Sequence, residues 1–285
     1  MKKIAVVTDS NSGITQKEAE NMGIKVVPMP FLINGEEYFE DITLNQEQFY
    51  EKLKGNAEVS TSQPSIERLS AIWDQVLTEY EELLYIPMSS GLSGSCQTAM
   101  MLAQDYEGRV KVVDNQRISV TQRNSVTDAL RMIEEGKTGG EIYDRLMETK
   151  LDASIYIMVD TLKYLKKGGR LTPAVAALGT ILRMKPVLQI QGEKLDTYAK
   201  ARTAKQGVSI MLDAMERDVK ERFGSNTEQL YFNIAHTQNE AGAQQLKEEI
   251  LQRYPQVPIL IDPLSLSVSC HIGPGSLAIA LAVKA

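Results

Sequence analysis

The sequence predicts an α/β protein of two domains, the first built on a parallel sheet covered by helices and the second on a mixed sheet. The chain has 285 residues, which is longer than a usual single domain. In its first half, short apolar runs alternate with amphipathic helical patterns, which is typical of a parallel sheet. In its second half, the tight turn at Gln191-Gly192-Glu193 joins two strand-like runs and indicates an antiparallel pair. We place the domains at 1–150 and 151–285.

The elements expected in the first domain follow from the periodicity of apolar residues. Asn34-Gly35 between apolar runs predicts a β-hairpin, an insertion near 31–40. Strands are expected at 3–8, 24–27, 82–87 and 110–113, and helices at 45–54, 65–80, 120–135 and 140–149.

In the second domain, two predictions concern its last thirty residues. Over 264–270, apolar residues alternate with serine, which predicts a half-buried strand with His271 on the serine side. The run 277–283 alternates large apolar residues with alanine and predicts a final strand buried on both faces. Further strands are expected at 154–159, 186–190, 194–198, 230–235 and 259–261.

Composition excludes several classes of partner. The chain is 43% hydrophobic and has a net charge of −6, so it can bury a large core and is repelled by nucleic acids and anionic membranes. No apolar stretch approaches the ~20 residues that span a bilayer, and the apolar run after Met1-Lys2-Lys3 is too short for a secretory signal. We therefore expect a cytoplasmic protein without stable membrane insertion. Cys96 and Cys270 lie in no metal-ligand pattern and are expected to be buried, reduced thiols.

The segment Met88–Ser95 is the most informative one for function. A Gly/Ser loop between a strand and a helix offers backbone N–H groups, hydroxyls and the positive end of the helix dipole to an anion. Ser93 is the natural hydroxyl donor in it. The alternative is that Ser93 or Ser95 only caps the helix. The segment has no P-loop lysine.

Three other polar segments stand out. In the run 60–65, Pro64 and Ser65 fit a helix start, which leaves Thr61 and Ser62 available for binding. His271 precedes Gly273-Pro274-Gly275 and could donate a hydrogen bond to a carboxylate, although a lone histidine is more often structural. The run 160–173 concentrates positive charge in an acidic protein, and its alternative reading is a solvated face. Its cations are Lys163, Lys166, Lys167 and Arg170.

Taken in order, these segments resemble the DegV family of bacterial proteins. The resemblance covers nearly the whole chain and rests on Thr8-Asp9-Ser10, Thr61-Ser62-Gln63-Pro64-Ser65, Ser89-Ser90-Gly91-Leu92-Ser93-Gly94, Asp160 to Arg170, and His271 with Gly273-Pro274-Gly275. The chain departs from the family pattern at Ser95-Cys96, Asn115 and Ile272. The resemblance implies a three-layer α/β/α first domain with a parallel sheet and a two-layer α/β second domain with a mixed sheet.

Members of this family resemble the fatty-acid-binding subunit of bacterial fatty acid kinase. The resemblance therefore implies a lipid-binding protein, itself no enzyme, that holds a long-chain fatty acid with its carboxylate in the inter-domain cleft and presents it to the kinase catalytic subunit for acyl phosphate formation. Thr61, Ser62, Ser93 and His271 would surround the carboxylate, and Arg170 with Lys167 would meet the kinase or the phosphate. No cofactor and no metal is expected besides the bound fatty acid.

Two other function classes compete with this interpretation. A serine hydrolase would use Ser93 and His271. In Gly91-Leu92-Ser93-Gly94-Ser95, however, Ser93 does not stand as the nucleophile of a Gly-x-Ser-x-Gly elbow, and no third catalytic acid is evident. A protein-interaction module would bind no lipid at all.

Overall fold

The structure, a computed structural model, describes residues 2–54, 57–176 and 184–285. The chain divides into two compact units. Unit 1 comprises Met1–Lys150 with Ser265–Ser267 and Ala285, and unit 2 comprises Leu151–Leu264 and Val268–Lys284.

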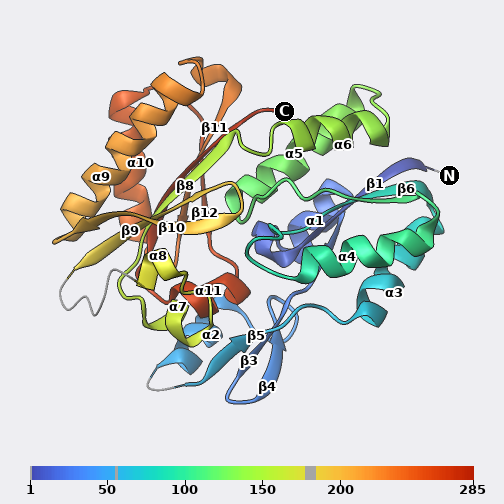
Figure 1. Cartoon of the computed structure of the whole chain (residues 1–285), viewed down its shortest axis with the longest axis horizontal. Coiled ribbons are helices and arrows are strands. Elements are labelled where there is room, and N and C mark those ends of the chain that lie inside the picture. Colours follow the sequence, from blue (N-terminus) through green and yellow to red (C-terminus); the bar gives the residue numbers. More distant parts are fainter. Residues whose placement is uncertain (1, 55–56, 177–183) are drawn as a thin grey trace. The chain divides into compact units, whose positions relative to one another are not determined.

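Parallel strands form the central sheet of unit 1 (Figure 1). In the described part of the chain their order across the sheet is β2-β1-β6-β7. The strands are β1 (Lys2–Asp9), β2 (Lys25–Val27), β6 (Tyr80–Ile86) and β7 (Val110–Val112). Each coincides with a strand that the sequence predicts, so the parallel sheet is confirmed.

Helices cover both faces of this sheet and make unit 1 a three-layer α/β/α fold. Along β1, Ile4 and Val6 enter one apolar cluster and Ala5 and Val7 the other, because successive strand residues point to opposite faces. The first cluster includes residues of α1 (Gln16–Met22), α5 (Val120–Glu134) and α6 (Gly139–Glu148). The second includes residues of α3 (Ile66–Leu77) and α4 (Ser95–Ala103).

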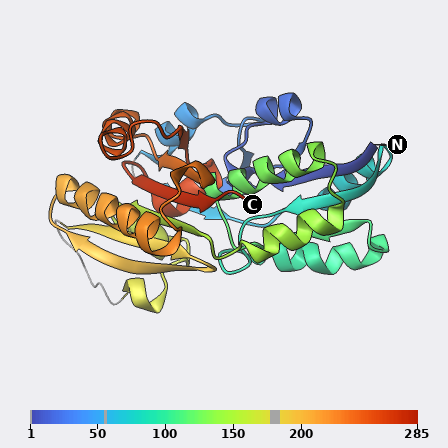
Figure 2. The ribbon, with the colours of Figure 1, turned by 90° about the horizontal axis from the view of Figure 1, so that it is seen from above.

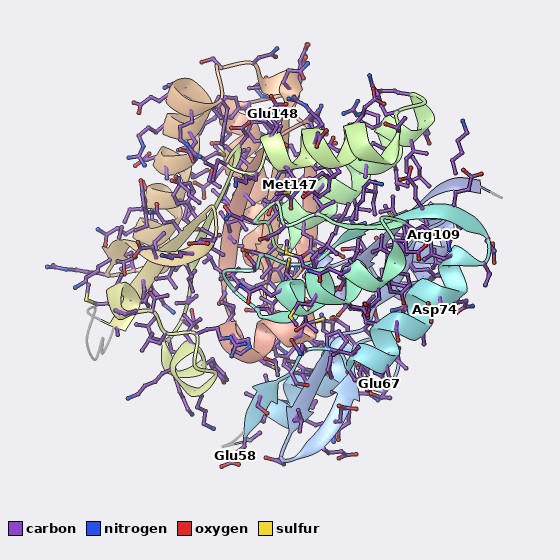
Figure 3. All side chains as sticks on the ribbon, turned by 45° about the vertical axis from the view of Figure 1, so that its right-hand side comes forward. Glu58, Glu67, Asp74, Arg109, Met147 and Glu148 are labelled. Atoms are coloured by element: carbon purple, nitrogen blue, oxygen red, sulfur yellow. The ribbon has the colours of Figure 1, made fainter. Side chains whose placement is uncertain are left out.

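The helix α3 shows how the sequence specifies these layers. The Ser65 hydroxyl caps it by accepting from the Arg68 N–H at 3.2 Å. Leu69 and Trp73, four residues apart, lie buried in the core. Glu67 and Asp74 lie along the exposed side of the same helix (Figure 3).

A small antiparallel sheet also belongs to unit 1. The predicted hairpin forms β3 (Pro30–Ile33) and β4 (Glu36–Phe39). A third strand that the sequence did not predict, β5 (Val59–Thr61), pairs with β3. The helix α2 (Gln46–Leu53) lies between β4 and β5 in the chain. Thr61 therefore ends a strand rather than lying in a loop.

A mixed sheet forms the centre of unit 2, as predicted. Among the described residues its order is β10-β9-β8-β13-β11-β12, in which β11 and β12 are parallel and the other pairs antiparallel. The strands are β8 (Ala153–Met158), β9 (Lys185–Gln191), β10 (Lys194–Ala201), β11 (Leu230–His236), β12 (Ile259–Pro263) and β13 (Leu277–Val283). The predicted burial of β13 is confirmed, since six of its seven residues are buried.

Two long helices pack on one face of this sheet, α9 (Ala204–Arg217) and α10 (Glu240–Arg253). Figure 2 shows α9 lying along β9 and β10. The shorter helices of unit 2 are α7 (Lys163–Lys167) and α8 (Pro173–Ala176). Single turns occur at Ser10–Ser12, Gln104–Tyr106, Asp218–Arg222 and Thr227–Gln229.

The prediction of a strand over 264–270 is wrong, because Leu266–Ile272 form a helix, α11. The serines do not mark a solvent-facing side, since Ser265, Ser267 and Ser269 are all buried. The Ser269 hydroxyl, for example, donates to the Leu264 carbonyl at 3.3 Å. A small side chain whose hydroxyl has a hydrogen-bond partner can be buried like an apolar one. Alternation of apolar residues with serine over 264–270 was therefore not a sign of a half-buried strand.

Candidate functional site

The loops that follow β1 and β6 lie at the point where the order of the parallel sheet reverses. The chain passes from β1 to β2 on one side and from β6 to β7 on the other, with β1 and β6 adjacent in the centre. In open parallel sheets, ligands bind at the carboxyl ends of the strands at such a reversal. The loop after β6 is the Gly/Ser segment that the sequence singles out, so the fold gives it a position typical of binding sites.

A buried polar network fixes the start of this loop. The Asp9 carboxylate, fully buried at the end of β1, accepts from the Met88 N–H at 2.9 Å and from Gln122 Nε2 at 3.1 Å. Burial raises the pKa of Asp9, and the hydrogen bonds from Met88, Gln122 and Asn11 oppose that rise. The sequence indicated Asp9 only as part of a motif at a strand end, and nothing in it connected Gln122 to Asp9.

Ser93 lies directly before the first turn of α4. Its Oγ accepts from the Ser95 N–H at 3.2 Å, so its own O–H remains able to donate to a ligand. The residue at the N-cap position is Gly94, which is exposed and makes no side-chain cap. The first amides of a helix have no intrahelical acceptor and form its positive end. Ser93 thus holds one first-turn amide and stands beside others that can bind an anion.

The segment containing Thr61 and Ser62 lies beside this helix start. Thr61 is the last residue of β5 and pairs with Phe31, and the Ser62 N–H donates to the Pro30 carbonyl at 3.3 Å. Ser62 is exposed and Thr61 is half-buried. The predicted cap is confirmed as Ser65, which leaves Thr61 and Ser62 outside the capping interaction.

Gln63 connects the two segments, a role that sequence reasoning missed. Its Oε1 accepts from Thr98 Oγ1 at 3.0 Å and lies 4.0 Å from where a Cβ at Gly94 would stand. The structure therefore brings the end of β5 and the first turn of α4 together within unit 1. A glutamine within a Thr-Ser-Gln-Pro-Ser run carries no signal for a partner thirty-five residues away.

In unit 2, His271 packs against the basic segment. A Cβ at Gly168 would lie 2.0 Å from His271 Nδ1, so a larger residue there would have to displace the imidazole or the backbone. Gly273, whose φ is +76°, approaches the Tyr164 ring equally closely, with a Cβ position 2.3 Å from Cδ2. The segment after α7 therefore approaches His271 closely at Gly168, and the segment after α11 approaches Tyr164 of α7 closely at Gly273.

Arg170 and Lys167 share this region with His271. Burial, and secondarily the positive charge of Arg170, lower the pKa of His271 to about 4. At neutral pH the imidazole is uncharged and can donate one N–H. The guanidinium of Arg170 is exposed and its Nη1 donates to the Gly168 carbonyl at 3.0 Å, and Lys167 is also exposed. The structure therefore brings three predicted site residues together in unit 2.

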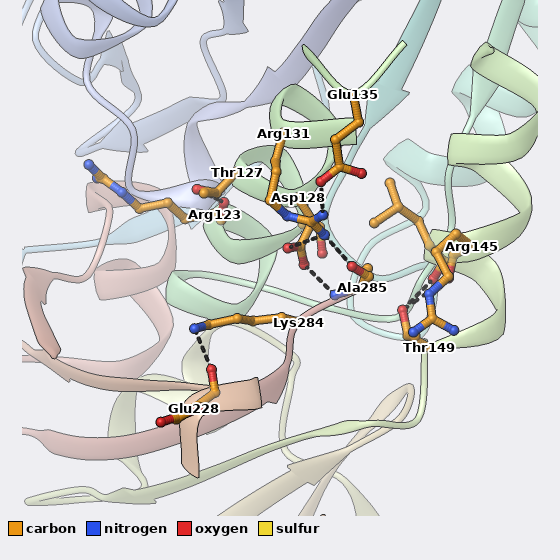
Figure 4. Close-up of polar contacts among 12 residues, drawn as sticks. Arg123, Thr127, Asp128, Arg131, Glu135, Arg145, Thr149, Glu228, Lys284 and Ala285 are labelled. Carbon is orange, nitrogen blue, oxygen red and sulfur yellow. Dashed lines mark hydrogen bonds and ion pairs between the residues drawn. The ribbon is translucent and has the colours of Figure 1, made fainter. Parts of the chain in front are cut away.

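A separate cavity of about 680 Å³ in unit 1 is lined by charged residues of α5 and α6. Its arginines are already paired, Arg131 with Glu135 at 2.5 Å and Arg145 with Glu148 at 2.8 Å. Figure 4 shows Arg131 between Glu135 and the last residue of the chain, Ala285. Carboxylates outnumber cations in the lining, with Glu135, Glu141, Asp144 and Glu148 against Arg131, Lys137 and Arg145, so this cavity is poorly suited to another carboxylate.

The two thiols and the possible metal ligands are further candidates for a functional site. Both cysteines are buried and unbonded to each other, and burial together with nearby Asp114 raises the pKa of the Cys96 thiol. Within residues 2–54, 57–176 and 184–285, no three or more His, Cys, Asp or Glu side chains are grouped to hold a metal ion. The helices in those ranges include none with the length and hydropathy of a membrane span.

Comparison with known proteins connects the whole chain to one family. Residues 3–284 match the family described as "Uncharacterised protein, DegV family COG1307". A DegV domain-containing protein of Halalkalibacterium halodurans is 31% identical over 282 residues, which is 98% of each chain.

Two solved structures have the same fold over their full length. One, described as showing fatty acid binding of a DegV family protein from Thermus thermophilus, superposes with a TM-score of 0.90 at 29% identity and covers 99% of both chains. The other is DegV of Bacillus subtilis, described as a fatty acid binding protein, with a TM-score of 0.88 at 29% identity and complete coverage of both chains.

Proposed function

Because the chain belongs to the DegV family, we propose that it binds a long-chain fatty acid by its carboxylate and presents that acid to a separate kinase. The observation that carries the proposal is the position of Ser93. Its hydroxyl stands beside the first turn of α4, in the loop at the reversal point of a parallel sheet. Similar proteins from Thermus thermophilus and Bacillus subtilis are described as fatty acid binding, which supports the choice of ligand.

The proposed head-group residues are Thr61, Ser62, Ser93 and His271. All are neutral hydrogen-bond donors, since the lowered pKa of His271 keeps its imidazole uncharged at pH 7. An ionised carboxylate taken out of water needs such donors. Hydroxyls and helix amides supply them without a buried counter-charge, so the head group can be released when its carboxylate reacts.

Affinity would come mainly from the acyl chain. Burying roughly sixteen methylenes at about 0.8 kcal/mol each gives on the order of 13 kcal/mol before the costs of ordering. The head-group donors would then fix which end of the lipid is presented. Because most of the binding free energy would come from the acyl chain, a long-chain acid should bind more tightly than a short polar one.

Arg170 and Lys167 are proposed to serve the encounter with the kinase or the nascent phosphate. Both side chains are exposed, and arginine presents a planar fork that suits phosphate oxygens. Arg170 and Lys167 are positively charged, whereas the residues proposed to bind the carboxylate are neutral, so the two groups are proposed to have different roles. In this proposal the chain itself performs no chemistry and the kinase subunit transfers the phosphoryl group.

The direct test combines extraction with a comparison of two ligands. Mass spectrometry of organic extracts from purified protein should find long-chain fatty acids. Titration of the delipidated protein should give far weaker binding for a methyl ester than for the free acid of equal length, because the ester lacks the anion. Equal affinities would place the head group elsewhere, and release of free acid from the ester by wild type but not by Ser93→Ala would favour a hydrolase instead.

A further inference from the structure

The helix that carries His271 is anchored at its start by residues far away in the sequence. The N–H of Leu266, the first residue of α11, donates to Glu40 Oε2 at 2.8 Å. The Ser267 hydroxyl donates to Asn11 Oδ1 at 2.6 Å. Both contacts lie within unit 1, to which Ser265–Ser267 belong, whereas α11 from Val268 onward groups with unit 2. The orientation of the helix start is thus fixed by different residues from those that contact its end.

Glu40 is itself held in place on its other oxygen. Its Oε1 accepts from Gln46 Nε2 at 2.8 Å, and its backbone forms a bridge with Leu44. A carboxylate bound through both oxygens has little freedom to move. Its negative charge next to a first-turn N–H is also favourable for the helix. Glu40 therefore defines where α11 begins.

Glu40 and Ser62 directly follow two strands of the same small sheet, β4 and β5, and Thr61 is the last residue of β5. Phe39, the neighbour of Glu40, pairs with Pro30 across the hairpin. The Pro30 carbonyl in turn accepts the Ser62 N–H on the far side. Glu40 and Ser62 accordingly lie at the same end of the sheet formed by β3, β4 and β5.

From these contacts we infer that Glu40 is a positioning residue, which orients His271 for the fatty-acid head group by fixing the start of α11. The contact that Glu40 makes at Leu266 would then act on His271, five residues further along the same helix. This inference rests on the proposed function and deepens it, because it assigns a role to a residue that does not touch the ligand.

The test compares Glu40→Ala with Glu40→Gln and with Glu37→Ala. Glu37 is an exposed glutamate of β4, the strand that ends directly before Glu40, so its variant removes the same charge three residues away. The chain has only two histidines, so the imidazole resonances of His271 and His236 are easily followed by NMR. Glu40→Ala should shift the His271 resonances, leave those of His236 in place, and weaken fatty-acid binding about ten-fold, as expected for one misplaced hydrogen bond to a charged group.

The conservative and control variants separate positioning from stability. Glu40→Gln keeps an oxygen that accepts the Leu266 N–H and should recover most of the affinity, and Glu37→Ala should match wild type. Adding Glu40→Ala to His271→Ala should cause no further loss of affinity. If Glu40→Ala proves too unstable to purify, Gln46→Ala, which removes the hydrogen bond from Gln46 to Glu40 Oε1, is compared with wild type in its place.

Two outcomes would overturn the inference. One is a Glu40→Ala variant with a lower melting temperature but unchanged His271 resonances and affinity. The other is a further ten-fold loss in the His271→Ala background, which would place the effect of Glu40 elsewhere. A wild-type protein that binds no fatty acid would instead refute the proposed function, and the NMR comparison would still decide whether Glu40 orients His271.

Discussion

His271 Nδ1 lies 2.0 Å from the position that a Cβ at Gly168 would occupy. Any other residue at 168 would have to displace the imidazole or the backbone of the basic segment. The φ of Gly168 is −79°, a value that all residues adopt, so glycine is required here by the close approach and not by its backbone conformation. The contact ties the placement of His271 to the segment that carries Lys167 and Arg170.

Gly168→Ala should therefore weaken fatty-acid binding by about ten-fold or more, through displacement of His271 and loss of its hydrogen bond. Affinity is measured by titration with a fluorescent fatty acid. Gly140→Ala is a suitable control, because the nearest atom to a Cβ there, Thr138 Oγ1, is 4.0 Å away. Unchanged affinity in Gly168→Ala would show that His271 does not contact the head group.

Ser93→Ala should reduce fatty-acid affinity without a matching loss of stability. Losing a hydrogen bond to a charged group costs ~1.5 to 3 kcal/mol of binding free energy. Ser65→Ala provides the contrast, because Ser65 caps α3 and its loss should lower the free energy of unfolding by about 1 kcal/mol and leave affinity unchanged. If Ser93→Ala behaved like Ser65→Ala, Ser93 would serve only the start of α4.

The sequence predicted the sheets well because their strands are buried and strongly apolar. β13 is an example, since large residues and alanine alternate along a strand whose both faces are covered. Neither β5 nor α11 was predicted. β5 is only three residues long, and two of its residues, Ser60 and Thr61, are polar. Its pairing with β3 is a long-range contact that leaves no periodicity in so short a run.

The candidate site was predicted residue by residue, but the groups that hold those residues were not. Ser93 and His271 belong to motifs that the sequence displays. Their supporting contacts, Gln63 with Thr98 and Gly168 with His271, join segments thirty-five and more than one hundred residues apart. Such contacts are set by packing in the folded chain, so a pattern within one segment carries no information about them.

Stability should fall as the pH decreases from about 6.5 to about 4, because His271 is neutral in the folded protein. Burial and the Arg170 charge lower its pKa to about 4, whereas an unfolded histidine titrates near 6.5. Between these values the unfolded state binds more protons, so acid favours unfolding. Titration of His271 should therefore lower the free energy of unfolding by on the order of 3 kcal/mol at most between pH 6.5 and pH 4, and it has no effect above pH 6.5.

Urea unfolding of wild type and His271→Asn at several pH values measures this contribution. Burial also lowers the pKa of His236, despite Glu240 at 2.9 Å, so a smaller pH dependence in the same direction should persist in the variant. An identical pH dependence in the two proteins would mean that the His271 imidazole is not held neutral by its surroundings.

Arg170→Ala should separate fatty-acid binding from phosphorylation of the bound acid by a partner kinase. The Arg170 side chain is exposed, and its Nη1 donates to the nearby Gly168 carbonyl at 3.0 Å. Removing this side chain should therefore leave fatty-acid affinity within about two-fold of wild type. Acyl phosphate formation by a partner kinase should fall strongly, because an arginine fork stabilises developing phosphate charge.

The variant should also reveal the electrostatic coupling of Arg170 to His271. The positive charge of Arg170 contributes to lowering the His271 pKa, so Arg170→Ala should raise that pKa, and Arg170→Lys should restore it while restoring phosphorylation incompletely. Lipid affinity, acyl phosphate formation and the His271 titration are measured on the same preparations at moderate salt, which screens diffuse steering. A large loss of lipid affinity with normal turnover of the bound fraction would assign Arg170 to the carboxylate, and this division of labour would then be refuted.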